Sequence, residues 1–134
     1  MPPSPGLPVL VVDPSPWFRQ AVRTLLIRSR RFRLVGEATT VAEATVLAAQ
    51  LRPGLVVLDV HLPDGSGVAA GLWIRRLLPP PLVLLASTYG EVDLPDEVRR
   101  SGLPYVDKAE FSESTLGTLL PATPRGEGSR SACR

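Results

Sequence analysis

The stretch that decides the fold reads Leu55-Val56-Val57-Leu58-Asp59-Val60-His61-Leu62-Pro63-Asp64-Gly65. Four apolar residues precede Asp59, and a proline and the turn pair Asp64-Gly65 follow it closely. A short apolar run bounded by turn residues is typical of a strand buried on both faces, as in parallel sheets. Asp59 is therefore expected at the end of a buried strand, on the sheet edge where α/β proteins bind ligands.

Strand patterns and helix patterns alternate along the rest of the chain. Further apolar runs predict strands at 7–12, 82–85 and 103–106, and residues 32–38 are expected to form another short strand. Helices are predicted from Pro16 to the Arg28–Arg31 cluster, with Ser15 as N-cap, and from Thr40 to Leu51, with Thr40 as cap. Further helices are predicted from about Val68 to Leu78, from Pro95 to Arg100 and after Ser112, which caps the last helix. The alternation predicts one α/β domain, a parallel sheet with helices on both faces.

The ends of the chain differ in composition from the middle. Residues 1–6 are rich in Pro and Ser, and residues 121–134 in Pro, Gly, Ser and Arg, so both are expected to be disordered. The domain is expected to span residues 7–120. Residues 65–67, Gly-Ser-Gly, are expected to form a loop.

Composition excludes several classes of protein. The formal net charge of +2 is too small to indicate a nucleic-acid partner, and a single cysteine, Cys133, cannot form an internal disulfide. No apolar run approaches the roughly 18 residues of a membrane span, and the first residues lack a signal-peptide pattern. A cytoplasmic protein that binds neither nucleic acid nor membrane directly is expected.

Four polar residues stand at the ends of four predicted strands: Asp13, Asp59, Ser87 and Lys108. A parallel sheet brings the carboxyl ends of its strands to one edge, so these side chains are expected to converge. A carboxylate at Asp59 can attack a phosphoryl group and carry it as an acyl phosphate. Asp13 and Asp59 offer oxygen ligands for Mg²⁺, and Lys108 and Ser87 offer a charge and a hydroxyl for the phosphoryl oxygens.

Over about residues 7–120 the chain resembles the receiver domain of bacterial two-component response regulators. The run from Leu58 to Gly65 resembles the phospho-acceptor motif of that family, and Val9-Leu10-Val11-Val12-Asp13 resembles its acidic first strand. Pro16-Trp17-Phe18-Arg19 continues as in the subgroup that usually carries a helix-turn-helix output domain and regulates transcription.

The resemblance implies a flavodoxin-like, doubly wound sheet of five parallel strands in the order 2-1-3-4-5. It implies that Asp59 accepts the phosphoryl group, with Lys108 and Ser87 contacting it. It also implies that Mg²⁺ binds the carboxylates of Asp13 and Asp59 and the backbone carbonyl of His61.

The same resemblance implies how the domain signals. A histidine kinase phosphorylates the aspartate, and Ser87 and Tyr105 act as switch residues that change the face made by the fourth helix, fifth strand and fifth helix. Such a domain is not classed as an enzyme, and a homodimer through that face is expected.

Three positions depart from the family pattern. Pro14 stands where the family has a second acid, which is expected to weaken Mg²⁺ binding, and Ala109 replaces the usual proline after Lys108. The entry of the fifth strand, Gly102-Leu103-Pro104-Tyr105, is one residue shorter than in the family. The switch position belongs to Ser87 or to Ala86, depending on where this one-residue gap is placed in the alignment with the family. The sequence therefore leaves open a second function, a degenerate receiver that works as a phosphorylation-independent binding or dimerisation module.

A flavodoxin-like ligand-binding protein or enzyme is a third class. It needs a glycine-rich phosphate loop after the first strand, and Asp13-Pro14-Ser15-Pro16 contains no glycine. The residues after Leu120 are too few and too polar to form a helix-turn-helix, so either a single-domain receiver or a piece of a longer regulator is expected.

Overall fold

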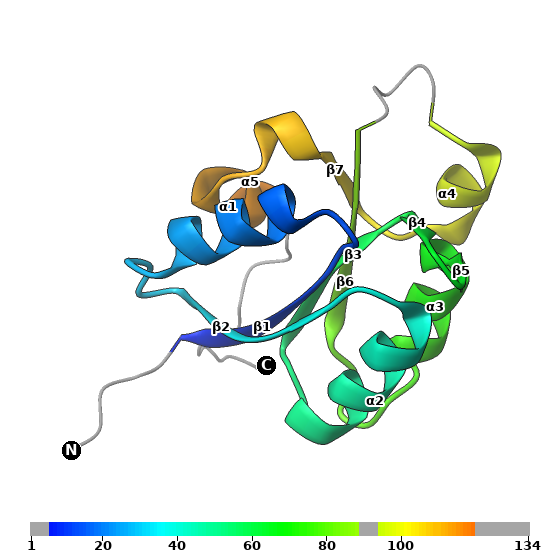
Figure 1. Cartoon of the computed structure of the whole chain (residues 1–134), viewed down its shortest axis with the longest axis horizontal. Coiled ribbons are helices and arrows are strands. Elements are labelled where there is room, and N and C mark those ends of the chain that lie inside the picture. Colours follow the sequence, from blue (N-terminus) through cyan, green and yellow to red (C-terminus); the bar gives the residue numbers. More distant parts are fainter. Residues whose placement is uncertain (1–5, 89–93, 120–134) are drawn as a thin grey trace, which may run out of the picture.

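A five-stranded parallel sheet forms the centre of the computed structural model, which describes residues 6–88 and 94–119 (Figure 1). The strand order is β2-β1-β3-β6-β7. The bounds are β1 Leu7–Val12, β2 Phe32–Ala38, β3 Leu55–Asp59, β6 Leu82–Ser87 and β7 Tyr105–Asp107. Counted along the chain within this sheet, the order is 2-1-3-4-5, so the predicted flavodoxin-like topology is confirmed.

Helices cover both faces of the sheet, as predicted. Figure 1 shows two helices on one face, α1 Pro16–Leu26 and α5 Glu113–Leu119. The other face carries α2 Val41–Leu51, α3 Gly67–Ile74 and α4 Asp96–Ser101. Side chains alternate along a strand, so Val9 and Val11 pack under α1 while Leu10 and Val12 pack under α2 and α3.

Helix α1 begins at Pro16, as predicted, but it ends earlier than predicted. Phe18, Val22 and Leu26 are buried at four-residue spacing. Ser15 holds the predicted N-cap position before Pro16, but its side chain makes no capping hydrogen bond. The helix ends before the arginine cluster because the Ser29 hydroxyl accepts the backbone N–H of Arg31 and Phe32 and forms a turn there.

Helix α2 begins at the predicted cap. Thr40 Oγ1 accepts the backbone N–H of Glu43 at 3.0 Å. The Glu43 carboxylate reaches back one residue beyond the cap and accepts both the N–H and the hydroxyl of Thr39 at 2.8 Å. These bonds fix the chain where β2 passes into α2.

The loop predicted at residues 65–67 is a small hairpin instead. Strands β4 His61–Leu62 and β5 Gly65–Ser66 pair antiparallel, and α3 starts directly at Gly67. A Cβ at Gly67 would lie 1.8 Å from the carbonyl oxygen of Asp59, so only glycine fits this close approach. Helix α3 also ends at Ile74, short of the predicted Leu78.

The remaining predictions need smaller corrections. Strand β6 continues to Ser87, and β7 starts at Tyr105 rather than Leu103. Lys108–Glu110 form a short 3-10 helix, η1, and Ser112 caps α5 by accepting the N–H of Thr115. The predicted tail 121–134, Leu120 and most of the predicted lead-in 1–6 lie outside the described residues. None of the helices in the described residues combines the length and the apolar composition that a membrane span requires.

Candidate functional site

Three of the four predicted site residues meet at the carboxyl edge of the sheet. Asp13 directly follows β1, Asp59 ends β3 and Lys108 directly follows β7. The Lys108 ammonium nitrogen lies 2.7 Å from Asp13 Oδ2 and 3.5 Å from Asp59 Oδ2. One cation therefore bridges two carboxylates that stand 46 residues apart in the chain (59 − 13).

The two carboxylates differ in their access to solvent. Asp13 is fully buried, whereas 13% of the Asp59 side chain is exposed. Burial raises the pKa of Asp59 most, and the charge of Asp13 raises it further, while Lys108 and the backbone N–H of His61 oppose both effects. Asp59 is therefore the carboxylate of this pair that a reactant can approach, and Asp13 is a fixed buried charge beside it.

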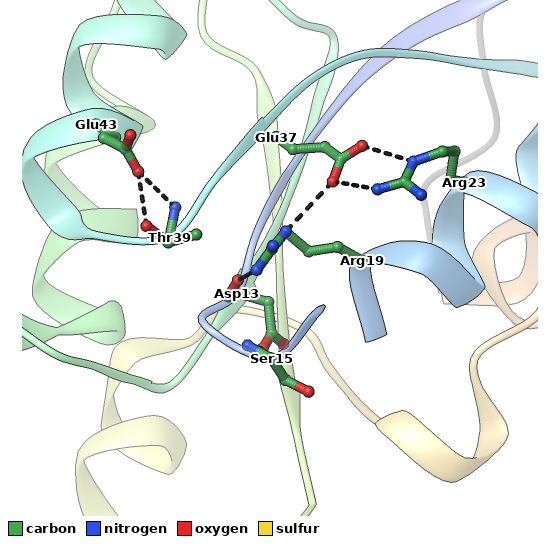
Figure 2. Close-up of polar contacts among 7 residues, drawn as sticks. All are labelled: Asp13, Ser15, Arg19, Arg23, Glu37, Thr39 and Glu43. Carbon is green, nitrogen blue, oxygen red and sulfur yellow. Dashed lines mark hydrogen bonds and ion pairs between the residues drawn. The ribbon is translucent and has the colours of Figure 1, made fainter. Parts of the chain in front are cut away.

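Asp13 is held at several of its polar atoms. Its Oδ1 accepts the backbone N–H of Ser15 at 2.8 Å, and its own N–H donates to the carbonyl of Ala38 at 2.9 Å. Its carbonyl accepts a hydrogen bond from Arg19 Nη1 at 2.7 Å (Figure 2). Oδ1 thus supports the turn into α1, while Oδ2 faces Lys108.

The donor set at this edge suits a divalent cation with few protein ligands. Among the described residues, Asp13 Oδ2 is buried and has no hydrogen bond of standard geometry, although Lys108 is close. In the same part of the chain no group of three or more His, Cys, Asp or Glu side chains comes together. Mg²⁺ commonly binds one or two carboxylates and completes its shell with water and phosphate oxygens, so Asp13 and Asp59 fit it.

Ser87 is less clearly part of this group. In the strand register Ala86 lies opposite Asp59, and Ser87 lies one residue further, opposite Asp107. Ala86 also belongs to the buried cluster under α1 and α5, the face to which the alternation along β3 assigns Asp59. The register thus favours Ala86, the alternative noted from the sequence, for the position beside the acceptor.

The other predicted residues lie around the group. Tyr105 is half-buried and packs against the core cluster under α2 and α3, and it pairs in register with Leu85. The His61 side chain is exposed on β4. The roles of Ser87 and Tyr105 as switch residues stay predictions.

Several supporting residues were not assigned a role from the sequence. The ring of Phe18 lies under the Lys108 ammonium, with 5.1 Å between nitrogen and ring centroid. Figure 2 shows Arg19 reaching both the Asp13 carbonyl and the carboxylate of Glu37, at 3.3 Å for the latter. From the sequence, Phe18 was noted as part of the stretch Pro16-Trp17-Phe18-Arg19. Glu37 carries no sequence signal, because its closeness to Asp13 depends on the pairing of β1 with β2.

Comparisons with known proteins show what the chain as a whole is similar to. The family model of the response regulator receiver domain matches residues 9–116. The sensory transduction protein LytT of Bacillus cereus is 31% identical over 113 residues, covering 84% of this chain and 46% of LytT. Protein-glutamate methylesterase/protein-glutamine glutaminase 3 of Hahella chejuensis is 36% identical over 81 residues, covering 60% of this chain and 23% of that protein.

A solved structure gives the same result for the fold. The signal receiver domain of the response regulator NarL from Mycobacterium tuberculosis superposes with a TM-score of 0.73 at 26% identity, covering 85% of this chain and 96% of that one. The chain spans less than half the length of the two curated relatives named above. The family match over most of the chain and the shared fold show that it belongs to the response regulator receiver domain family.

Proposed function

We propose that this receiver domain, residues 7–120, accepts a phosphoryl group on Asp59 from a histidine kinase. The observation that carries the proposal is the Lys108 ammonium, which lies within reach of both Asp13 and the partly exposed Asp59. A carboxylate oxygen of Asp59 attacks phosphorus, the new O–P bond forms, and the P–N bond to the donor imidazole breaks with the electron pair leaving on nitrogen.

Each neighbouring group has a distinct task in that transfer. Lys108 neutralises charge on a phosphoryl oxygen and helps to keep Asp59 ionised against the burial that disfavours its charge. Asp13 and Asp59, with the backbone carbonyl of His61, would hold Mg²⁺, which when bound supplies further neutralisation of the phosphoryl oxygens. Because Pro14 carries no carboxylate, this binding is expected to be weaker than with a second acid.

The phosphoryl group would act by biasing two packings of the same fold. It adds charge and acceptor oxygens at the edge where β3, β6 and β7 end, so a packing that supplies donors there becomes favoured. We propose that Tyr105 transmits this to the face formed by α4, β7 and α5. The second switch position belongs to Ser87 or to Ala86, and the strand register favours Ala86 because it lies opposite Asp59. That face is the proposed surface for partners or for a homodimer.

Other features of the proposal follow the family. The domain works in the cytoplasm as a signalling module rather than an enzyme, and it does not bind nucleic acid itself. Any transcriptional output would come from a DNA-binding partner or a further domain. This is the arrangement in the subgroup with a helix-turn-helix output domain, which the stretch Pro16–Arg19 resembles.

A second candidate function rests on Pro14. With Lys108 already 2.7 Å from Asp13 and one acid missing, the site is compatible with a domain held in one state without phosphate. Such a domain would be a phosphorylation-independent binding or dimerisation module.

Intact-mass measurement after incubation with acetyl phosphate separates the two functions. The proposal predicts a Mg²⁺-dependent gain of one phosphoryl group that is absent from Asp59→Asn. A wild-type protein that stays unlabelled, under conditions in which another receiver is labelled, would favour the binding module. Labelling of Asp59→Asn at the wild-type level would remove Asp59 from the acceptor role.

A further inference from the structure

The peptide unit between Asp13 and Pro14 can form hydrogen bonds only through its carbonyl group. Pro14 has no N–H, so the carbonyl of Asp13 is the only hydrogen-bonding group of this peptide unit. Arg19 Nη1 donates to that carbonyl at 2.7 Å, from one turn further along the chain in α1 (Figure 2). Hydrogen bonds from a charged donor are shorter and stronger than neutral ones, so this contact is a substantial restraint on the main chain at Asp13.

Arg19 is in turn oriented by Glu37 at the end of β2. The distance between Arg19 Nε and Glu37 Oε1 is 3.3 Å. Arg23 holds the same carboxylate with two bonds, Nε to Oε2 at 2.8 Å and Nη2 to Oε1 at 2.9 Å. The bonds from Arg23 and Arg19 lower the pKa of Glu37 against the opposing effect of its burial, so Glu37 carries its charge at neutral pH.

The two arginines share one partner but differ in what else they contact. The side chain of Arg19 is 19% exposed and reaches the main chain of the site, whereas that of Arg23 is 52% exposed, and its recorded hydrogen bonds go to Glu37. The link from Glu37 to the site therefore passes through Arg19. Arg23 provides a natural control, since its loss removes charge from the same cluster without freeing the Asp13 carbonyl.

We propose that Arg19, oriented by Glu37, is a positioning residue that aims the Asp13 carboxylate at the cation and phosphoryl site of Asp59. The proposal rests on the proposed function. Asp13 is the carboxylate that the end of β1 contributes, because Pro14 stands in the place of the second acid. A rotation of the Asp13 main chain would move Oδ2 away from Lys108, and the end of β1 has no second acid to take its place.

The test compares Mg²⁺ affinity, measured by titration calorimetry, in the wild type, Arg19→Gln, Glu37→Gln and the control Arg23→Gln. Loss of a group that orients a metal ligand typically weakens metal binding by about 10- to 100-fold. We expect a weakening of about tenfold in Arg19→Gln, a smaller one in Glu37→Gln, and less than twofold in Arg23→Gln. Arg19→Lys, which keeps a charged donor, should recover part of the affinity. Glu37→Gln keeps the size of the side chain and serves as the test variant if Arg19→Gln fails to fold.

Labelling by acetyl phosphate, followed on the same proteins, separates this inference from the proposed function. Equal Mg²⁺ affinity in wild type, Arg19→Gln and Glu37→Gln overturns the positioning role, and wild-type labelling would still support phosphorylation. A wild type that binds Mg²⁺ but is never labelled overturns the proposed function, while the calorimetric comparison still decides the role of Arg19. A wild type that binds no Mg²⁺ overturns the positioning role.

Discussion

The Asp59 carboxyl group is held in a setting that disfavours its charge. Burial and the neighbouring charge of Asp13 raise its pKa above the usual value of an aspartate, and Lys108 compensates for part of this. A buried group that must carry charge for function lowers the stability of the fold, which is a common cost at reactive sites. Because its pKa is raised, Asp59 makes the stability of the fold depend on pH.

Replacing Asp59 by Asn should stabilise the protein in the absence of Mg²⁺. The folded protein retains the Asp59 proton at pH values where the unfolded chain has released it, so wild-type stability falls as the pH rises from 3.8 through the raised folded pKa. The stability of Asp59→Asn does not fall in this way. The difference in the free energy of unfolding between the variant and the wild type should therefore grow across that pH interval to on the order of 1 kcal/mol and then stay constant. Urea denaturation of both proteins at a series of pH values measures it. If the free energies of unfolding of the two proteins changed in parallel with pH, the raised pKa of Asp59 would be contradicted.

Pro14 gives a second prediction for a single residue. Pro14→Asp places a third carboxylate next to Asp13 and Asp59 and should increase Mg²⁺ affinity by about tenfold, because hard cations gain from each added carboxylate oxygen. Calorimetry on wild type and variant measures the change, and Pro14→Asn is the matched control that adds an oxygen without charge. Equal affinity in wild type and Pro14→Asp would show that Pro14 is not the defect proposed.

Among the elements, the β4–β5 hairpin connects the acceptor to two helices. It begins two residues after Asp59, and Asp64 in its turn accepts the N–H groups of Val41 and Ala42 at 2.7 and 3.1 Å, which caps α2. The Ser66 hydroxyl donates to the carboxylate of Glu97 in α4 at 2.9 Å. The hairpin is thus a route by which a change at Asp59 can reach both α2 and α4.

Gly67 fixes this hairpin against the end of β3. Gly67→Ala would place a Cβ 1.8 Å from the Asp59 carbonyl oxygen, so we expect a loss of roughly 3 kcal/mol or more in the free energy of unfolding. Gly102→Ala is the control, because Gly102 has a φ of +73° but open space around it, and its replacement should cost about 1 kcal/mol. Chemical denaturation of both variants compares the costs. Equal losses would mean that the close approach at Gly67 relaxes easily.

The elements also show which parts of the fold the sequence can predict. The strands β1 and β2 were predicted at their observed bounds, and β1 stands out because it is an apolar run that ends at Asp13-Pro14. The β4–β5 hairpin was missed, since two-residue strands are too short to show alternation. The end of α1 was placed too late, because the turn at Ser29 depends on a side-chain hydrogen bond that competes with the helix.

For the site, strand ends were enough to predict that Asp13, Asp59 and Lys108 converge. The position of Ser87 was not settled by the sequence, because it depends on a register shift of one residue, which moves a side chain to the other face of the sheet. Glu37 and Arg19 were not predicted as part of the site, since their contact joins two elements through long side chains.

At the scale of the whole molecule, two hydrophobic clusters, one on each face of the sheet, support a single reactive edge. Strands β1, β3 and β6 are buried between the two helix layers, so the ends that carry Asp13 and Asp59 are held by packed cores on both sides. Sites built on rigid strands keep their geometry more precisely than sites on loops. A fold of this kind can present a reactive carboxylate while the helices around it change packing.

The central claim, that Asp59 receives the phosphoryl group, is tested most directly by locating that group in the chain. The protein is incubated with acetyl phosphate and Mg²⁺ and then reduced with borohydride, which converts an aspartyl phosphate into a primary alcohol. Peptide mass spectrometry then identifies the reduced side chain. The account predicts reduction at Asp59 alone, with no reduced peptide from Asp59→Asn; reduction at Asp13 or Asp64, or no reduction in the wild type, would contradict it.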